Sequence, residues 1–347
     1  EHSARCVNAV LRTGALLVSG HGDGIIRCME SQGGKMVREV TGHTGYVSSL
    51  APCGGAMGCC TFASGSYDRT VRLWDLESGT PLQQWCEHQD CVNQVHFCDP
   101  LARNLLGSCS WDGTLKLWDV RTQSSAQTLE GHMGVVSSFA PCGMYLAGST
   151  GNIESCVLSV SHDRSAILWD LRTMTSLRVM HPAAEATGST KETVTRGTAA
   201  HPDMITALTW LPFSAPAFHQ AYLLLDADEG TGPEFVVGTL DGRLIRMWVE
   251  SGRAEVLSHC HSKAVSQLQC ISFSDPLAPE DDESPQARYP LVVSSSYDGS
   301  VLLTNVVSKE SSTVAEQSDI HRVYSLHACV TQVSPHLSTF LLPLSIS

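Results

Sequence analysis

The sequence predicts an all-β fold in which a unit of short strands is repeated along the chain. Three segments, residues 62–75, 106–119 and 158–170, align with one another, and each ends in Trp-Asp. Within each unit, short β-branched and apolar runs alternate with a period of two and are broken by Asp-Gly or Asp-Arg turns. No long segment has the 3.6-residue period of a helix, so we expect little helix.

An aspartate in the turn of each unit gives the repeat length. The turn aspartates are Asp23, Asp68, Asp112, Asp163, Asp241 and Asp298. The first four are 45, 44 and 51 residues apart, and the last two follow after 78 and 57 residues. A fixed period of this size indicates an array of supersecondary units that bury their apolar faces against one another.

Composition excludes some classes of partner. The chain has 347 residues and a formal net charge of -13, with 22 Lys and Arg against 35 Asp and Glu. A negative field repels phosphate backbones, so we expect no broad nucleic-acid binding. No apolar run approaches the roughly 20 residues that span a bilayer, so we expect no membrane insertion.

The 14 cysteines are scattered and form no CxxC pair. In a chain of this length we interpret them as buried free thiols in a reducing compartment, the cytoplasm or the nucleus. We expect no metal site and no cofactor.

The Gly-His and Trp-Asp dipeptides carry a family resemblance. They are Gly42-His43, Trp74-Asp75, Trp118-Asp119, Gly131-His132 and Trp169-Asp170. Over roughly residues 2–330 the chain resembles the WD40-repeat family, in which four strands form each blade of a β-propeller. The resemblance implies a WD40-type propeller with six recognisable four-stranded blades, a partial seventh blade and long inter-strand insertions.

A single propeller domain over residues 1–347 is therefore expected. Its blades cover about residues 4–41, 42–86, 87–130, 131–181, 200–258, 259–317 and, for the partial blade, 318–347. The partial blade would hold an inner strand near 323–329, led by His321, and a second strand at 339–346. Three alternatives stay open: the protein continues past Ser347, another segment closes the ring, or six blades close with a loose tail.

Three insertions interrupt the blades. Residues 182–200 are small and polar and predict a flexible linker. Residues 212–233 predict a long loop, and residues 275–290 a loop around the acidic run 280–283. We interpret that run as solvated, in preference to a metal site or a site for a basic partner.

The family resemblance implies a buried hydrogen-bonded chain of Trp, Ser or Thr, His and Asp. In the second blade these would be Trp74, His43 and Asp68, with either Ser64 or Ser66. The same set is expected in the third and fourth blades as His88, Ser110, Asp112 and Trp118, and as His132, Ser161, Asp163 and Trp169. Pairing both ring nitrogens of a buried histidine satisfies groups that are costly to bury alone.

Repetition argues against a Ser-His-Asp catalytic triad, because an enzyme needs one such site. We therefore expect no catalytic residue. Three blades depart from the pattern: Trp248 stands seven residues after Asp241, Thr304-Asn305 replaces Trp-Asp, and the first blade has Cys28 or Met29 at that place. These blades should be less rigid.

Aromatic side chains collect at one position of the repeat. In the family the residue before the turn aspartate points to the top face, and here these residues are Gly22, Tyr67, Trp111, His162, Leu240 and Tyr297. Tyr46 belongs beside them. Because Tyr and Trp are enriched at binding hot spots, we predict a protein-binding surface that comprises Tyr46, Tyr67, Trp111, His162 and Tyr297. The other interpretation is chance exposure or packing between blades.

Two Trp-Asp-x-Arg boxes end at Arg121 and Arg172 in consecutive blades. They resemble the boxes of cullin-4 substrate receptors, which implies adaptor docking through these arginines on the bottom face. The competing interpretation is an exposed arginine at a strand end, since the second blade has Glu77 there. The leading hypothesis is a protein-interaction scaffold, the alternative is a cullin-4 type substrate receptor, and an enzyme comes last.

Overall fold

The computed structural model describes most of the chain as strands joined by turns. The described residues are 6–53, 61–98, 104–122, 124–142, 156–182, 204–211, 233–249, 251–274, 288–316, 326–327 and 345–346. Within these ranges the structure has no helix, and the all-β prediction is confirmed.

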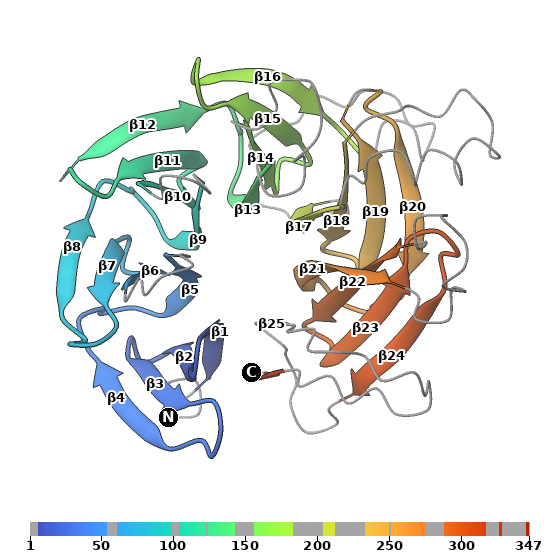
Figure 1. Cartoon of the computed structure of the whole chain (residues 1–347). Helices are drawn as coiled ribbons and strands as arrows, with labels where there is room; N and C mark the ends of the chain where they lie inside the picture. The colour runs from blue at the N-terminus through green and yellow to red at the C-terminus, as the bar shows by residue number, and fades with distance from the viewer. Residues whose placement is uncertain are drawn as a thin grey trace, which may run out of the picture.

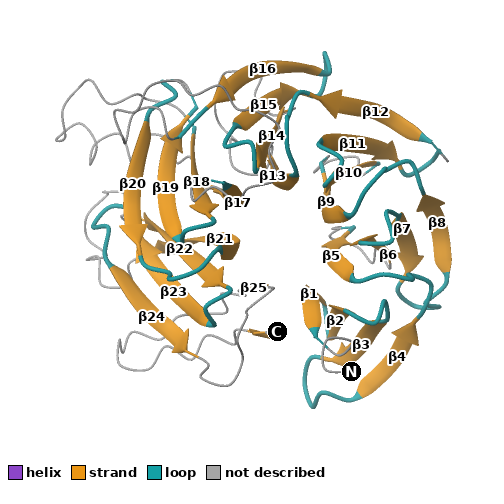
Figure 2. Cartoon of the chain, turned by 180° about the vertical axis from the view of Figure 1, so that it is seen from behind, coloured by secondary structure: helices purple, strands orange, loops and turns teal. Residues whose placement is uncertain are grey.

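Six four-stranded antiparallel sheets are arranged as the blades of a propeller (Figure 1). Strand order in each sheet follows the chain, so every blade is a meander. Blades 1 to 6 comprise β1–β4, β5–β8, β9–β12, β13–β16, β17–β20 and β21–β24. The view from behind shows the same ring, with the fourth strand of each blade on the circumference (Figure 2).

Each strand position in a blade has its own place in the ring. The first strands surround the centre: β1 (Val7–Thr13), β5 (Val47–Pro52), β9 (Val92–Phe97), β13 (Val136–Pro141), β17 (Ile205–Trp210) and β21 (Val265–Ser274). The second strands are β2 (Leu16–His21), β6 (Thr61–Ser66), β10 (Leu105–Ser110), β14 (Cys156–Ser161), β18 (Glu234–Thr239) and β22 (Arg288–Ser296). The third strands are β3 (Ile26–Glu30), β7 (Val71–Asp75), β11 (Thr114–Asp119), β15 (Ala166–Asp170), β19 (Arg243–Trp248) and β23 (Ser300–Asn305). The fourth strands are β4 (Met36–Val40), β8 (Pro81–Trp85), β12 (Ser125–Glu130), β16 (Thr175–Met180), β20 (Ala254–His259) and β24 (Ser311–Glu316).

A short two-stranded sheet lies between the first and last blades. In it β25 (Leu326–His327) pairs antiparallel with β26 (Ser345–Ile346). Strand β25 contacts both β1 and β21, as each inner strand of the ring contacts its neighbours. The predicted fold class, an all-β propeller with six four-stranded blades, is thereby confirmed, and β25 and β26 lie within the range predicted for a partial seventh blade.

The predicted insertions fall largely outside the described residues. This holds for residues 183–203, 212–232 and 275–287. The predicted loop 275–290 was too long at its end, because residues 288–290 belong to β22. There Tyr289 pairs with Phe273 and Pro290 with Ser272.

The core lies between neighbouring blades. Strands β14 and β15 are buried at every residue, whereas the fourth strand β16 is exposed at every residue except Met180. Between blades 2 and 3, Val71 and Leu73 pack in one apolar cluster with Leu106 and Trp118. A sheet covered on both faces is apolar on both faces, so burial falls off only at the outermost strand.

Glycines in the second strands let the next blade approach closely. A Cβ on Gly65 would lie 2.7 Å from Cγ1 of Val92 and 3.0 Å from Cγ1 of Val95, both in β9 of the next blade. Gly238 meets Val265 in the same way, at 2.6 Å. A side chain at these positions would push the neighbouring inner strand outward.

We expect Gly65→Ala to lower the free energy of unfolding by about 1–3 kcal/mol, the usual cost of overpacking a close-packed interior. Urea unfolding followed by tryptophan fluorescence measures this change. In a Val92→Ala background the smaller side chain leaves room for the new methyl group. There Gly65→Ala should lower the free energy of unfolding clearly less than it does in the wild type. Strict additivity of the two changes would contradict this account of blade packing.

A row of side-chain hydrogen bonds joins the inner strands of successive blades. The side chains of Ser48, Asn93, Ser137 and Thr206 donate to backbone carbonyl oxygens of the next inner strand, at 2.6, 2.9, 2.7 and 2.6 Å. Their acceptors are Val92, Val136, Ile205 and Val265. These bonds fix the spacing of the blades around the centre.

Candidate functional site

Blade 3 contains a complete buried hydrogen-bond chain. Trp118 Nε1–H donates to Ser108 Oγ at 2.8 Å, and Ser108 Oγ lies 2.7 Å from Nε2 of His88. His88 Nδ1 lies 2.7 Å from Oδ2 of Asp112. With the Nδ1–H tautomer, every group has a partner: the indole donates to serine, serine to imidazole, and imidazole to carboxylate.

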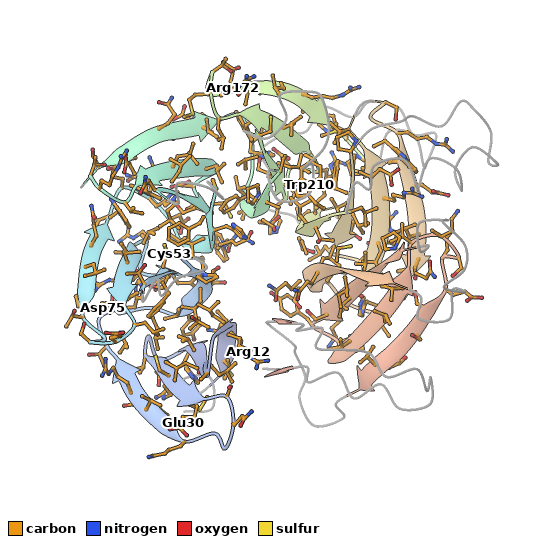
Figure 3. The ribbon with its side chains drawn as sticks, in the orientation of Figure 1. Arg12, Glu30, Cys53, Asp75, Arg172 and Trp210 are labelled. Atoms are coloured by element: carbon orange, nitrogen blue, oxygen red, sulfur yellow. The ribbon has the colours of Figure 1, made fainter. Side chains whose placement is uncertain are left out.

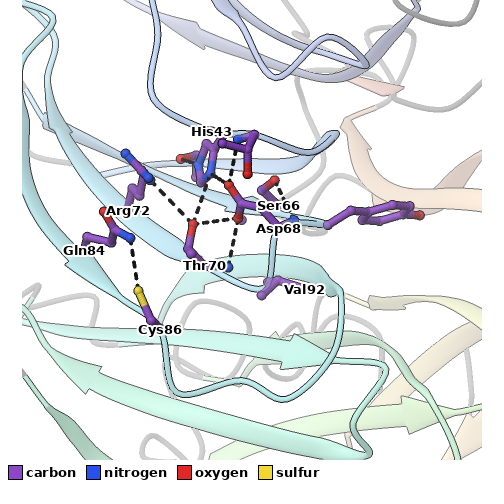
Figure 4. Close-up of polar contacts among 12 residues, drawn as sticks. His43, Ser66, Asp68, Thr70, Arg72, Gln84, Cys86 and Val92 are labelled. Atoms are coloured by element: carbon purple, nitrogen blue, oxygen red, sulfur yellow. Dashed lines mark hydrogen bonds and ion pairs between the residues drawn. The ribbon is translucent and has the colours of Figure 1, made fainter.

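Blades 2 and 4 repeat this chain. In blade 2, Trp74 donates to Ser64 at 2.7 Å, and His43 lies 2.7 Å from Ser64 and 2.8 Å from Asp68. Figure 4 shows the contacts of His43 with Asp68 and Thr70. In blade 4, Ser159 lies 2.8 Å from both Trp169 Nε1 and His132 Nε2, and His132 Nδ1 lies 3.1 Å from Asp163.

The serine predicted for blades 3 and 4 was wrong. The serine that joins the tryptophan to the histidine is the preceding residue on the same face of the strand. Trp118 is paired with Leu106, so Ser108, two residues along, is the next side chain on the same face of the sheet. Ser110 ends β10, where its hydroxyl donates to Asp90 O and accepts from the Asp112 N–H. By the same register Ser159 replaces the expected Ser161, and Ser64 resolves the choice in blade 2.

The turn aspartate connects three segments of its blade. Asp112 Oδ2 accepts from His88 and from the Gln89 N–H, and Oδ1 accepts from the N–H and hydroxyl of Thr114. The sequence signal for the second contact is a Ser or Thr two residues after the aspartate. It occurs at Thr70, Thr114, Ser165 and Ser300.

These aspartates are held ionised. Burial raises the pKa of Asp68, Asp112 and Asp163, but hydrogen bonds from the histidines and from Thr70, Thr114 and Ser165 outweigh it. The pKa of each therefore lies well below its usual value.

The three serines of the chain are fully buried, with hydroxyls bonded on both sides. A nucleophile must reach substrate, and a hydroxyl that is fixed between an imidazole and an indole cannot do so without breaking the blade. The arrangement can stabilise a fold and orient a turn.

The other three blades depart from this chain, and in blade 5 Met247 pairs with Phe235 as Trp74 pairs with Phe62. In blade 6, His261 bonds Ser294 and Ser300 at 2.8 Å each, and Thr304 stands in place of the tryptophan. In blade 5, the Trp248 ring lies 4.6 Å from the Arg246 guanidinium. In blade 1 the corresponding residue is Met29, because it pairs with Leu17 as Trp74 pairs with Phe62.

One backbone hydrogen bond recurs at the turn before the aspartate in all six blades. The residue before the aspartate donates its N–H to the carbonyl of a residue at or just before the first strand, at 2.9 or 3.0 Å. The pairs are Gly22 with Cys6, Tyr67 with Tyr46, Trp111 with Cys91, His162 with Val135, Leu240 with Met204, and Tyr297 with Ala264. Each blade therefore presents one such pair of side chains at the same end of its strands.

Three aromatic residues of blades 2 and 3 form a continuous group, which we call the aromatic crest: Tyr46, Tyr67 and Trp111. The ring centroids of Tyr46 and Tyr67 are 5.7 Å apart, as are those of Tyr67 and Trp111. The three residues are 42%, 38% and 44% exposed. Trp111 Nε1–H donates to Asn93 Oδ1 at 2.7 Å, which fixes the indole.

The other two predicted surface residues occupy the same position in other blades. Tyr297 follows β22 in blade 6, on the opposite side of the ring from blade 2, and is partly exposed. His162, in blade 4, is half-buried, and burial lowers its pKa. The crest thus unites three of the five residues predicted from the sequence. Asn93, which holds Trp111, was not among them.

The two arginines of the Trp-Asp-x-Arg boxes fold back on their own aspartates. Arg121 donates through Nε and Nη2 to Asp119 at 2.8 and 2.6 Å, and Arg172 donates to Asp170 at 3.2 and 3.0 Å. Their side chains remain 69% and 52% exposed. Figure 3 places Arg172 at the outer rim of the ring.

The described residues include no cluster of three or more His, Cys, Asp or Glu that could hold a metal ion. No disulfide joins the described cysteines to one another, and burial raises the pKa of Cys156 to about 11 and of Cys270 to about 12. No helix suited to spanning a membrane occurs in the described part of the chain.

Comparisons with known proteins agree with this architecture. The family model "WD domain, G-beta repeat" matches residues 34–75 and 79–119. Nuclear distribution protein PAC1 of Arthroderma otae is 37% identical over 123 residues, which are 35% of this chain and 26% of PAC1. PAC1 of Fusarium vanettenii is 34% identical over 132 residues, 36% of this chain and 29% of the relative.

Each similarity covers about a third of the chain and little more than a quarter of the relative's length. The two matched segments correspond to β4–β7 and β8–β11, so the repeat unit begins with the outer strand of the preceding blade. The same meander and the same turn contacts recur in blades outside the two segments that the family model matches. Residues 34–75 and 79–119 therefore match the WD40 repeat in sequence, and the ring of six four-stranded blades has the architecture that the resemblance implied.

Proposed function

We propose that this protein is a non-catalytic interaction scaffold that holds peptide or protein partners on the aromatic crest. The observation that carries the proposal is the contact of three exposed aromatic rings contributed by two blades. Large exposed aromatic groups bring much contact area at a small cost in conformational entropy.

The crest is preorganised by the structural chain beneath it. Tyr67 and Trp111 directly precede Asp68 and Asp112, whose carboxylates are bonded to buried histidines. Because the turns and the Trp111 indole are already fixed, binding need not order them. This supports a role in which a rigid ring presents side chains to a partner.

The burial of the serines supports a non-catalytic role. The Ser-His-Asp sets occur in three blades, and each serine hydroxyl is engaged by an indole. A WD40 propeller of this kind serves interaction, and the features that differ between its blades are the candidates for specificity.

We expect the double variant Tyr67→Ala/Trp111→Ala to lose specific partners, because truncation removes two contacting rings and leaves the fold intact. Affinity purification with mass spectrometry, using the wild-type protein as bait, identifies the partners to be followed. The matched control is Leu82→Ala/Leu177→Ala, which truncates exposed residues on outer strands β8 and β16. Equal capture by both double variants would count against the crest.

A second candidate is adaptor docking by a cullin-4 type substrate receptor. It is favoured by two exposed guanidinium groups fixed by their own aspartates in neighbouring blades. Under this proposal Arg121→Ala/Arg172→Ala releases a co-purifying adaptor, and wild-type protein that captures none removes the candidate. The free thiols of the described residues support a reducing compartment, the cytoplasm or the nucleus.

A further inference from the structure

Trp111 offers a partner its ring face and no hydrogen-bond donor. The only donor of the Trp111 side chain is its indole N–H, which Asn93 Oδ1 already accepts. A proline-rich segment has unpaired carbonyls and binds best where aromatic residues also donate to them. The engaged indole therefore favours a ligand that is attracted to a π-face itself.

Three aspartates lie close to the turns that carry these rings. Asp68 and Asp112 follow Tyr67 and Trp111, and the pKa of each is well below its usual value, so both are charged. The exposed Asp90 lies beside Cys91, whose Sγ contacts the Tyr67 carbonyl. Arg69, exposed on the Tyr67 turn, is a cation that opposes them.

The field of the whole chain has the same sign, with a formal net charge of -13. Such a field concentrates cationic ligands near the surface. An acidic or phosphorylated peptide would need a cluster of arginines, whereas the described turns that carry Tyr67 and Trp111 contain one, Arg69.

We propose that the aromatic crest binds the cationic side chain of a lysine, methylated lysine or arginine in a partner peptide. The cation would lie over the faces of Tyr67 and Trp111, whose ring centroids are 5.7 Å apart. A cation within about 6 Å of an aromatic centroid is attracted by the ring quadrupole. This inference rests on the proposed scaffold function and names the chemistry of its ligand.

The test uses the full 347-residue chain with its seven tryptophans replaced by 5-fluorotryptophan. Trp111→Phe assigns the Trp111 fluorine resonance. The probes are nine-residue Gly-Ser-Ala peptides whose central residue is trimethyllysine, lysine, acetyl-lysine or glutamate, together with a nonaproline peptide. Each is titrated to several millimolar and followed by fluorine NMR.

We expect trimethyllysine and lysine peptides to shift the Trp111 resonance saturably, with acetyl-lysine binding at least about tenfold more weakly because acetylation removes the charge. Tyr67→Phe should keep the affinity within about twofold, and Tyr67→Ala should weaken it about five- to tenfold. Leu82→Ala is the control and should leave every titration unchanged.

The inference is overturned if acetyl-lysine or nonaproline binds as well as trimethyllysine, or if no cationic probe shifts Trp111. If the Tyr67→Ala/Trp111→Ala variant nevertheless loses its partners, the scaffold function stands and only the cation assignment fails. If the variant keeps all partners while cationic probes bind the wild-type protein and not the variant, the cation assignment stands and the crest is not the scaffold's docking surface.

Discussion

Ser108→Ala should lower the free energy of unfolding by about 2–4 kcal/mol. The substitution removes a small hydroxyl, but it leaves two buried nitrogens, Trp118 Nε1 and His88 Nε2, without their common partner. Each unsatisfied buried polar group costs about 1–3 kcal/mol. Urea unfolding at neutral pH, followed by circular dichroism, measures the loss.

The matched control is Ser110→Ala in the same strand. Ser110 is also fully buried, but its bonds are to the Asp90 carbonyl and the Asp112 N–H, outside the tryptophan–histidine link. We expect a loss of about 0.5–1.5 kcal/mol, typical of one ordinary hydrogen bond. If Ser110→Ala is as destabilising as Ser108→Ala, the assignment of Ser108 to the chain is contradicted.

Stability should fall steeply in acid. Asp68, Asp112 and Asp163 have a lower pKa in the folded than in the unfolded protein, so the unfolded state binds more protons as the pH falls. Their contribution is complete above the unfolded pKa of about 4 and is lost as the pH falls toward the folded values. Three protons give a slope of about 4 kcal/mol per pH unit below pH 4.

Urea midpoints measured between pH 3 and pH 7 test this slope. Asp112→Asn removes one of the three groups, so its stability should start lower and decline with a slope about one third smaller. A wild-type midpoint that stays constant from pH 5 to pH 3 would contradict the proposed charge state of the turn aspartates.

Local sequence patterns were sufficient to predict the blades. Each Asp-Gly or Asp-Arg turn fixes a hairpin, and each Trp-Asp marks the third strand, so six meanders follow from contacts within about 45 residues. Choosing the serine was harder, because the two candidates in each strand point to the same face of the sheet: Ser64 and Ser66 in one, Ser108 and Ser110 in the other. Only the register against Trp74 and Trp118 separates them.

The repeat pattern could not predict the contacts between blades. Asn93 lies in β9 and accepts from Trp111 after β10, while its amide donates to Val136 of the next blade. The close approach of Tyr67 and Trp111 also depends on how two blades pack. Position before the aspartate predicted these residues individually, but it could not show which of their rings contact one another.

The structural and functional features of this propeller differ in how often they recur. The bond between the residue before the aspartate and the start of the blade occurs six times, and the full Trp-Ser-His-Asp chain three times. The aromatic crest occurs once. A feature that is needed for stability is expected in many blades, whereas a binding surface depends on what distinguishes a few.

The central claim is that the Ser-His-Asp sets are permanently engaged by buried indoles and therefore serve the fold. Hydrogen exchange of the indole N–H groups of Trp74, Trp118 and Trp169, measured by ¹⁵N NMR, tests it directly. We expect all three protons to exchange over hours or longer, and Ser108→Ala to accelerate Trp118 alone. Exchange of all three within minutes in the wild-type protein would show that the serines are not held by the indoles and would contradict the account.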